Sequence, residues 1–333
     1  MALTNWSTLH QDAFDGRRAL VTGGAGFIGS HLSEALIDLG ASVVVFDDLS
    51  GGDVENLADF TARAGDRLSF VEGSILDEAT LAQAIDGCDY VFHQAALGSV
   101  PRSVEQPVRY QQVNATGTLN VLEAARAAKI KRVMFAASSS AYGDSPTLPK
   151  IETMPVRARS PYAATKAAGE ALMSAYAASY GLDTVGLRYF NIFGPRQNAN
   201  SAYAAVIAAF AKSLRAQERP LIFGDGEQSR DFTFVDNAVH ANLLAARCEK
   251  PLDGAVLNVA CGQCVTVTEL AVMMAKIMGQ PDLLPEYRDE RAGDVKHSLA
   301  DLTLTQQMLG YAPVVPFEQG LESAVKWYES VMV

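Results

Sequence analysis

The segment Arg18–Leu39 (RALVTGGAGFIGSHLSEALIDL) places a glycine-rich turn between an apolar run and a helical pattern. The run Ala19–Val21 predicts a buried strand. Four glycines follow and fit either G-x-G-x-x-G or G-x-x-G-x-x-G: Gly23, Gly24, Gly26 and Gly29. Such glycines permit a tight turn and close approach of the backbone to a phosphate group, and the helix N-terminus supplies unpaired N–H groups. The glycines by themselves are a weak signal, but the strand before them and the helix after them predict a dinucleotide-binding start to the fold.

The next apolar run, Ser42–Asp47, predicts a second strand that ends in a carboxylate. Asp47 follows the glycines at the spacing, roughly 20 residues, at which an acid binds the ribose 2′-hydroxyl of NAD. Asp47 and Asp48 have no arginine beside them, and their charges would repel a 2′-phosphate. We therefore expect NAD rather than NADP as the cofactor.

Length and charge exclude several classes of protein. The 333 residues allow one large domain, or a large and a small one. The net charge of −11, with no cluster of lysine and arginine, argues against nucleic acid as a partner. No run approaches the roughly 18 apolar residues of a membrane span, and residues 1–18 read as a short polar arm. We therefore expect a cytoplasmic protein with no membrane partner.

The cysteines do not predict a disulfide framework or a metal site. Cys261 and Cys264 form a lone C-x-x-C, and the other two cysteines are far from them in the sequence. Zinc would need a second pair of ligands, and no histidine lies at metal-ligand spacing. We expect a reduced turn and no metal.

Strands alternate with helices through residue 137, which predicts an α/β fold with a Rossmann-like, doubly wound parallel sheet. The expected strands after the first two are Leu68–Glu72, Tyr90–His93, Arg132–Ala137, one that ends near Leu187, Pro220–Phe223 and Ala255–Val259. The expected helices after the glycine turn are Glu78–Ile85, Pro107–Ala128, one that opens at Pro161, Ala202–Ala216, Val235–Cys248 and Phe317–Val331.

The fifth strand runs into the serines Ser138–Ser140, and a later helix begins with Pro161 in its first turn. Tyr162 and Lys166 are four residues apart on that helix and therefore share a face. A lysine cation near a tyrosine stabilises the phenolate and lowers the pKa of the phenol, which makes the tyrosine a usable general base near neutral pH. A serine hydroxyl would complete a proton relay to a substrate alcohol.

Taken together, TGGAGFIGSHL, HQAA, SSSAYG, PYAATK, LRYFNIFGPRQ and GDGEQSRDF resemble the extended short-chain dehydrogenases/reductases, in their nucleotide-sugar epimerase and dehydratase branch. The resemblance covers nearly the whole chain. It implies an NAD-binding Rossmann domain of residues 1–190 plus about 235–260. It also implies a smaller C-terminal α/β domain, about 191–234 plus 261–333, that binds a UDP-sugar.

The resemblance makes Ser138, Tyr162 and Lys166 the catalytic group, with Lys166 also on the nicotinamide ribose. The cofactor-binding residues that it implies are Gly23, Gly26, Phe27, Ile28, Gly29, Asp47, Asp48, Ser50, Gly52, Ser74, Ile75, Gln94, Ala95, Ala96, Asn114, Tyr162, Lys166, Tyr189 and Ile192. The substrate-binding residues are Ser99, Ser138, Ser139, Ser140, Tyr162, Asn191, Gln197, Ala205, Phe223, Arg230, Arg291 and Ser298.

Three further features follow from the resemblance. Arg230 and Arg291 resemble a diphosphate clamp, a task that suits the planar, permanently charged guanidinium. Two positions depart from the family pattern: Ser74, where many relatives have an aspartate, and Phe232, where an aromatic residue with a hydroxyl is common. Relatives also form homodimers through a four-helix bundle, here the alanine-rich helices Val108–Ala128 and Tyr162–Tyr180 of each subunit.

The residues after Ser138 favour epimerisation over dehydration. The dehydratases carry an Asp-Glu pair directly after the catalytic serine or threonine, and the decarboxylating relatives a glutamate, where this chain has Ser139 and Ser140. Without those carboxylates, the resemblance implies oxidation of C4 of a UDP-hexose by NAD and return of the hydride to the other face of a 4-keto sugar.

The sequences ALGSVPRS, ASSSAYGD, FGPRQNANSAYAAVI and GDVKHSLAD resemble bacterial UDP-N-acetylglucosamine 4-epimerases. Ser298 aligns with a bulky tyrosine in glucose-restricted relatives, and a serine leaves room for an acetamido group. We therefore expect interconversion of UDP-GlcNAc and UDP-GalNAc, with UDP-glucose 4-epimerase as an alternative. UDP-glucuronate 4-epimerase is a further alternative, in which Arg196 or Arg157 would have to bind the C6 carboxylate of the sugar. A non-catalytic NAD-binding regulatory protein is an alternative of a different class.

Overall fold

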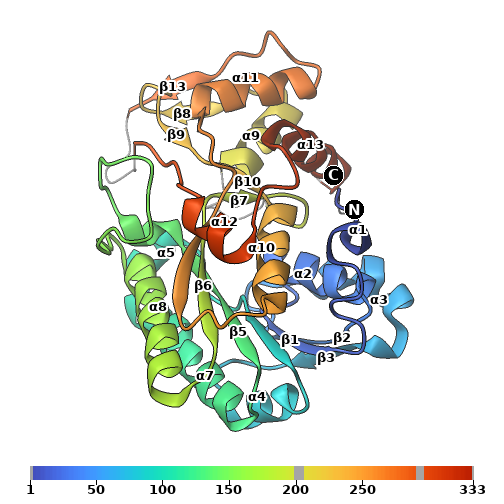
Figure 1. Ribbon diagram of the computed structural model, residues 1–333. Coiled ribbons are helices and arrows are strands. Elements are labelled where there is room, and N and C mark those ends of the chain that lie inside the picture. Colours follow the sequence, from blue (N-terminus) through green and yellow to red (C-terminus); the bar gives the residue numbers. More distant parts are fainter. Residues whose placement is uncertain (1–2, 199–205, 290–295, 332–333) are drawn as a thin grey trace.

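The computed structural model describes residues 3–198, 206–289 and 296–331. Seven strands of the described chain form a parallel sheet in the order β11–β6–β5–β4–β1–β2–β3 (Figure 1). Their bounds are β1 Arg18–Thr22, β2 Ser42–Asp47, β3 Leu68–Glu72, β4 Tyr90–His93, β5 Arg132–Ser138, β6 Thr184–Tyr189 and β11 Ala255–Val259. The strand order reverses between β1 and β4, and ligands of such sheets bind at the carboxyl ends of the strands at that point. The predicted Rossmann-like, doubly wound sheet is confirmed.

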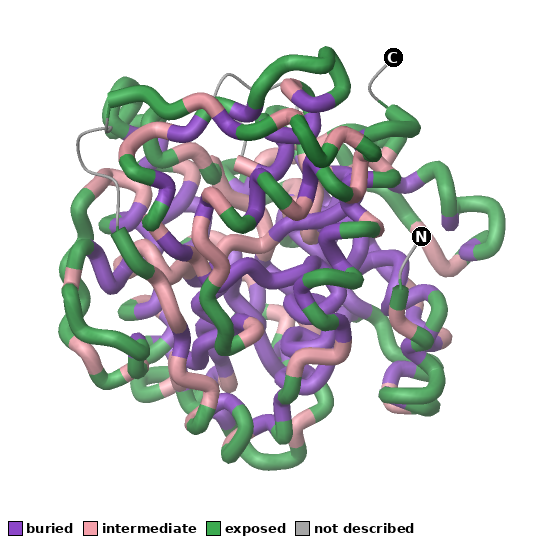
Figure 2. Tube along the Cα trace, turned by 90° about the horizontal axis from the view of Figure 1, so that it is seen from above, coloured by how far each residue is buried: buried purple, intermediate pink, exposed green. Residues whose placement is uncertain are grey.

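Helices cover both faces of the sheet because alternate strand residues point to opposite sides. Val21 and Val45 pack on one face, with α2 (Phe27–Asp38) and α10 (Val235–Arg247). Leu20 and Val44 pack on the other face, with α4 Glu78–Ile85, α7 Gly117–Ala127 and α8 Pro161–Tyr180. Figure 2 shows the resulting interior as a continuous region of buried chain. Three shorter helical segments, η1 Val54–Leu57, α3 Ala58–Ala64 and η2 Gly65–Arg67, connect β2 to β3.

The N-terminal segment is a short helix, α1 (Trp6–His10), so the prediction of a polar arm was wrong. Trp6 and His10 lie one turn apart on one face of this helix, and both are buried. Nε2 of His10 lies 3.0 Å from Nδ1 of His240 on α10. The backbone N–H groups of Leu3 and Thr4 donate to Oδ2 of Asp236, at 2.9 and 3.1 Å. The buried side chains of Trp6 and His10 and these hydrogen bonds together hold the N-terminal segment against α10.

The helix expected over Pro107–Ala128 is present and ends at Ala127, but it is not α-helical throughout. It consists of α6 Pro107–Tyr110, a π-helical turn at Gln111–Thr116, and α7, and a separate short helix, α5 Val100–Glu105, precedes it. The side chain of Asn114, in the π turn, bonds to both backbone groups of Leu97 and to Oγ1 of Thr165. These bonds tie the turn to the chain that leaves β4, so tertiary contacts replace a regular helix here.

The remaining elements form a smaller part of the molecule, drawn above the sheet in Figure 1. Its strands pair two by two: β7 Ile192–Phe193 with β10 Thr233–Phe234, β8 Leu221–Phe223 with β13 Glu286–Arg288, and β9 Ser229–Arg230 with β12 Val265–Thr266. Its helices are α9 Val206–Arg215, α11 Val267–Ile277 and α13 Phe317–Val331, and their apolar faces share a separate core around Phe193, Phe234 and Phe317. We propose that this core marks the smaller domain expected from the sequence. Helix α12 (Thr303–Leu309) packs instead against β11 and α10 of the sheet.

None of the helices within the described ranges is long and apolar enough to cross a membrane.

Candidate active site

A cavity of about 930 Å³ runs along the carboxyl ends of the sheet strands and reaches the smaller part of the molecule. The predicted cofactor residues that line it are Gly23, Gly26, Phe27, Ile28, Gly29, Asp47, Asp48, Ser50, Gly52, Ile75, Gln94, Ala95, Ala96, Tyr162, Lys166, Tyr189 and Ile192. The predicted substrate residues that line it are Ser99, Ser138, Ser139, Ser140, Asn191, Gln197, Arg230 and Ser298. Residues far apart in the sequence thus meet around a single space.

Five predicted residues have other positions. Ser74 and Asn114 do not line the cavity, and Asn114 bonds to protein groups as described above. Phe223 lines a neighbouring cavity of about 310 Å³, which shares Arg230 with the large one. Ala205 and Arg291 lie outside the described residues.

The glycine turn brings backbone, rather than side chains, to one end of the cavity. Gly23 has φ of +67°, and a Cβ there would lie 2.7 Å from the backbone nitrogen of Ala95. A Cβ on Gly29 would lie 2.1 Å from the carbonyl oxygen of Gly23. Helix α2 begins after Gly26, and among the described residues no side chain caps it and no acid lies in its first turn. Its free N–H groups therefore face the cavity and fit a diphosphate.

Asp47 lies at the end of β2, beside this turn. Its Oδ2 accepts from the backbone N–H of Ala25 at 3.0 Å, and its Oδ1 from that of Leu49 at 2.9 Å. Burial raises the pKa of Asp47, and these hydrogen bonds oppose the rise. A Cβ on Gly52 would come within 2.9 Å of the carboxylate, so the loop fits only with a glycine there. A carboxylate held in this way can still accept from ribose hydroxyls, and the residues of this end fit NAD.

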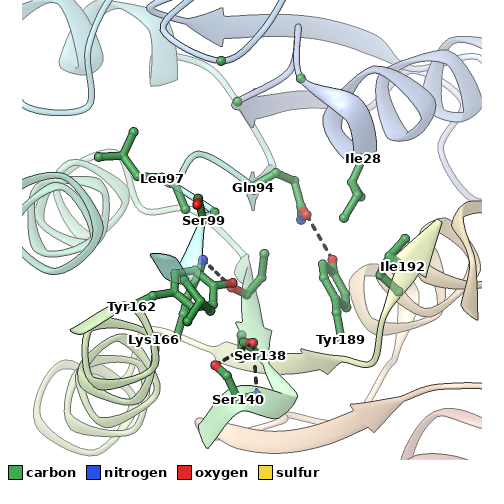
Figure 3. A pocket seen from close by; sticks show the side chains of 18 of the residues that line it. Ile28, Gln94, Leu97, Ser99, Ser138, Ser140, Tyr162, Lys166, Tyr189 and Ile192 are labelled. Atoms are coloured by element: carbon green, nitrogen blue, oxygen red, sulfur yellow. Dashed lines mark hydrogen bonds between the residues drawn. The ribbon is translucent and has the colours of Figure 1, made fainter. Parts of the chain in front are cut away.

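Ser138, Tyr162 and Lys166 meet where β5 ends against the first turns of α8 (Figure 3). Oγ of Ser138 accepts from the backbone N–H and the hydroxyl of Ser140, at 3.2 and 2.9 Å. Tyr162 lies close enough to Ser138 for the serine hydroxyl to lower the pKa of the phenol. Nζ of Lys166 lies 6.0 Å from the centre of the Tyr162 ring and donates to the carbonyl oxygen of Ala136 at 2.8 Å. A base, a relay hydroxyl and a cation are thus together in one wall of the cavity.

The protonation of this group differs from the sequence prediction in one respect. Burial raises the pKa of Tyr162, and Ser138 only partly opposes the rise, so the predicted lowering was wrong for the protein without ligands. Burial also lowers the pKa of Lys166 to about 7, against the opposing charge of Glu170.

A closed triangle of side chains supports the wall next to the catalytic group. The hydroxyl of Tyr189 donates to Oε1 of Gln94 at 3.1 Å and accepts from Nδ2 of Asn242 at 2.7 Å (Figure 3 shows the first bond). Nε2 of Gln94 donates to Oδ1 of Asn242 at 3.3 Å. Burial raises the pKa of Tyr189 to about 12, so it acts as a neutral hydroxyl. Sequence reasoning missed Asn242 because nothing local sets it apart from other helix residues.

The opposite end of the cavity carries Asn191, Arg230 and Ser298. Asn191 has φ of +40°, and its Nδ2 donates to the carbonyl oxygen of Asp231 at 3.0 Å. Ser298 donates its backbone N–H to the carbonyl oxygen of Ser229 at 3.1 Å. Nη1 of Arg230 also bonds to the carbonyl oxygen of Ser229, at 3.0 Å. Ser298 is therefore hydrogen-bonded to β9, the short strand to which Arg230 belongs.

The arginines that a uronate substrate was expected to meet are elsewhere. Arg196 is buried in ion pairs with Glu34 (2.8 Å) and Asp59 (3.3 Å), behind helix α2. Arg157 does not line the cavity. The cationic side chains that do line it, besides Lys166 and Arg230, are Arg102, Arg109, Lys150 and Arg159, which sequence reasoning missed. Within the described part of the chain, no group of His, Cys, Asp and Glu could hold a metal ion.

Comparison with known proteins identifies the family. Residues 19–260 match the NAD dependent epimerase/dehydratase family. A UDP-glucose 4-epimerase of Mycolicibacterium smegmatis is 39% identical over 316 residues, 94% of this chain and 99% of the relative. The chain therefore belongs to the NAD dependent epimerase/dehydratase family. It is an enzyme that uses NAD, which contradicts the non-catalytic alternative.

Solved structures show the same similarity. The UDP-N-acetylglucosamine 4-epimerase from Methanobrevibacter ruminantium, in complex with UDP-N-acetylmuramic acid, is 42% identical with a TM-score of 0.89, covering 95% of this chain and 99% of that one. The UDP-glucose 4-epimerase of Thermotoga maritima with UDP-glucose is 38% identical with a TM-score of 0.88, covering 95% and 100%.

Proposed function

We propose that this enzyme is an NAD-dependent 4-epimerase of UDP-hexoses that interconverts UDP-GlcNAc and UDP-GalNAc. The observation that carries the proposal is the meeting of Ser138, Tyr162 and Lys166 in the cavity that also receives the N-terminus of α2. Ser139 and Ser140 line the same wall without a carboxylate, which supports epimerisation rather than dehydration. The related 4-epimerases support the same reaction.

In this proposal the three side chains move and hold the proton of the C4 hydroxyl. Tyr162 accepts that proton through its phenol oxygen, and the hydroxyl of Ser138, in the same wall of the cavity, relays it. Tyr162 must therefore act as a phenolate, and the cation of Lys166 would stabilise that phenolate before the proton is transferred. The N-terminus of α2 would hold the diphosphate of NAD and Asp47 its ribose, and the bound cofactor would supply the redox chemistry by which the C4 hydride is removed and returned to the opposite face of the 4-keto sugar.

The preference for an acetamido sugar is inferred from Ser298. This small side chain lines the cavity beside Arg230, where we place the sugar diphosphate. A serine leaves space for an acetamido group at C2, although its size does not demand one. The similarity to a UDP-N-acetylglucosamine 4-epimerase supports this substrate, and the similarity to UDP-glucose 4-epimerases keeps UDP-glucose as the second candidate.

A homodimer and a cytoplasmic location also remain proposals. The exposed apolar side chains Val104 (65% exposed) and Val108 (69%) and the ring of Tyr180 (58%) belong to α5, α6 and α8. They are available to a helix bundle between two subunits.

The test is to incubate the purified protein with UDP-GlcNAc, without added cofactor, and to follow the configuration at C4 by proton NMR. Appearance of UDP-GalNAc supports the reaction, the substrate and a co-purifying NAD. No conversion, even with NAD added, overturns the acetamido substrate. If UDP-glucose and UDP-glucuronate are not converted either, this result would overturn the reaction class.

A further inference from the structure

Asn258, on β11, is completely buried behind the sugar end of the cavity. Its Oδ1 accepts from the hydroxyl of Tyr142 at 2.6 Å. Its Nδ2 donates to the carbonyl oxygens of Lys150 and Asp301, at 2.9 and 3.0 Å. Both donors of the amide are engaged and its oxygen is bonded, so this side chain joins three separate segments.

Each of these segments lines the cavity. Tyr142 ends the turn that carries Ser139 and Ser140, and all three face the cavity. Lys150 lines it as well, and its backbone N–H donates to the carbonyl oxygen of Leu299 at 2.7 Å. Leu299 directly follows Ser298. The positions of the serine turn, the Lys150 loop and Ser298 are therefore coupled through Asn258.

Asn258 is itself held from two further directions. Its backbone N–H donates to Oε1 of Glu152 at 2.9 Å, and its carbonyl oxygen accepts from Oγ1 of Thr305 at 2.7 Å. Its strand pairs in register with β6, where Asn258 lies opposite Arg188. The side chain thus projects from a strand of the sheet toward three segments of the cavity wall. Loops that build a binding site need such support, because small displacements of the walls change the fit of a substrate.

We propose that Asn258 is a positioning residue that sets the width of the sugar pocket and thereby the selection at C2 of the hexose. This inference rests on the proposed 4-epimerase function. Asn258 does not touch the substrate in this proposal; it acts through Tyr142, Lys150 and the segment of Ser298.

The test is Asn258→Asp, which keeps the shape of the side chain and replaces its donor group by an oxygen that faces the carbonyl groups of Lys150 and Asp301. The matched control is Asn237→Asp. Asn237 is equally buried and does not line the cavity. Its Nδ2 donates to the carbonyl oxygen of Val315 at 2.8 Å, and its Oδ1 accepts from the backbone N–H of Val315 at 2.9 Å. Both substitutions remove buried hydrogen bonds. If Asn258 had only a structural role, the two variants should show the same effect on substrate selectivity.

We expect Asn258→Asp to raise KM for UDP-GlcNAc about tenfold and to lower the ratio of kcat/KM for UDP-GlcNAc over UDP-glucose about fivefold. The NAD content of the purified protein should stay unchanged. Asn237→Asp should lower Tm and keep that ratio within about twofold of the wild type. If Asn258→Asp does not fold, Asn258→Ser tests the same change, because it also removes both donated bonds.

An unchanged ratio in a folded Asn258 variant, or an equal change in the Asn237 variant, would overturn the inference while the proposed function stands. A wild-type protein that converts neither UDP-sugar would overturn the proposed function instead. Binding of UDP-GlcNAc and UDP-glucose, measured by calorimetry, checks the same selectivity without turnover.

Discussion

The ammonium nitrogen of Lys166 donates a hydrogen bond to the carbonyl oxygen of Ala136, at 2.8 Å. The cation is therefore anchored to strand β5, two residues before Ser138, and it lies 5.0 Å from the centre of the Phe135 ring. One helical turn further along α8, Glu170 binds Arg188 through both carboxylate oxygens, at 2.8 and 2.7 Å. A buried cation and a buried ion pair thus follow one another on one helix face.

The first prediction concerns Lys166 and pH. Burial lowers the pKa of Lys166 from its ordinary value of 10.5 to about 7. Between these values the unfolded chain binds a proton that the folded chain has released, so the free energy of unfolding rises with pH, by up to about 1.4 kcal/mol per pH unit. Lys166→Met lacks this contribution. In urea unfolding without ligands, wild type should gain stability relative to Lys166→Met from about pH 7 to about pH 10. A constant difference would contradict the lowered pKa.

The second prediction concerns the proposed base. Tyr162→Phe removes the phenol oxygen and should lower turnover of UDP-GlcNAc by at least about 100-fold, with the NAD content unchanged. Proton NMR of C4 and the absorbance of the released cofactor measure the two quantities. The control is Tyr311→Phe, which removes another buried hydroxyl, bonded to the carbonyl oxygen of Ala260 at 2.9 Å. Undiminished turnover of Tyr162→Phe would require a different base.

The third prediction concerns Ser298. Ser298→Tyr adds a bulky ring where we place the acetamido group, so conversion of UDP-GlcNAc should fall by at least about tenfold while conversion of UDP-glucose is kept. Steady-state kinetics with UDP-GlcNAc and with UDP-glucose measures both rates of conversion. Equal loss with both would show that the serine does not select at C2.

The fourth prediction concerns the ion pair of Glu170 and Arg188. Both side chains are buried, and the guanidinium also lies 4.5 Å from the centre of the Tyr142 ring. Glu170→Gln leaves Arg188 as a buried charge without its carboxylate and should lower the free energy of unfolding by about 3–5 kcal/mol. The double variant Glu170→Met/Arg188→Leu should recover much of this loss in urea unfolding. Additive losses would show that the two residues do not act as a pair.

The fifth prediction concerns the contact of α1 with α10. Burial lowers the pKa of His10 to about 3 and that of His240 to about 4. Below the ordinary histidine pKa of about 6.5, the unfolded chain binds protons that the folded pair does not, so folding loses free energy as pH falls. His240→Gln removes one of these groups. The stability advantage of wild type over His240→Gln should therefore shrink from about pH 6.5 to about pH 4. An advantage that grows over this range would contradict a neutral His240.

Features that depend on neighbours along the chain could be predicted from the amino-acid sequence. The strands Tyr90–His93 and Ala255–Val259 and the helix Phe317–Val331 have the predicted bounds. Each begins directly after a residue typical of turns, namely Asp89, Gly254 or Pro316. The glycine turn and the shared helix face of Tyr162 and Lys166 are also local, since they follow from spacing alone. These features were sufficient to predict the sheet, the cavity end that fits NAD and the residues proposed for catalysis.

In contrast, the packing of the folded chain sets which distant groups meet and how deeply they are buried. Asn258 lies 116 residues from Tyr142 along the chain, and Asn242 lies 53 residues from Tyr189, yet each pair is hydrogen-bonded. The docking of α1 and the pKa of Lys166 depend on the same packing. A sequence records which groups are present, whereas desolvation and long-range hydrogen bonds depend on what the folded chain places around them.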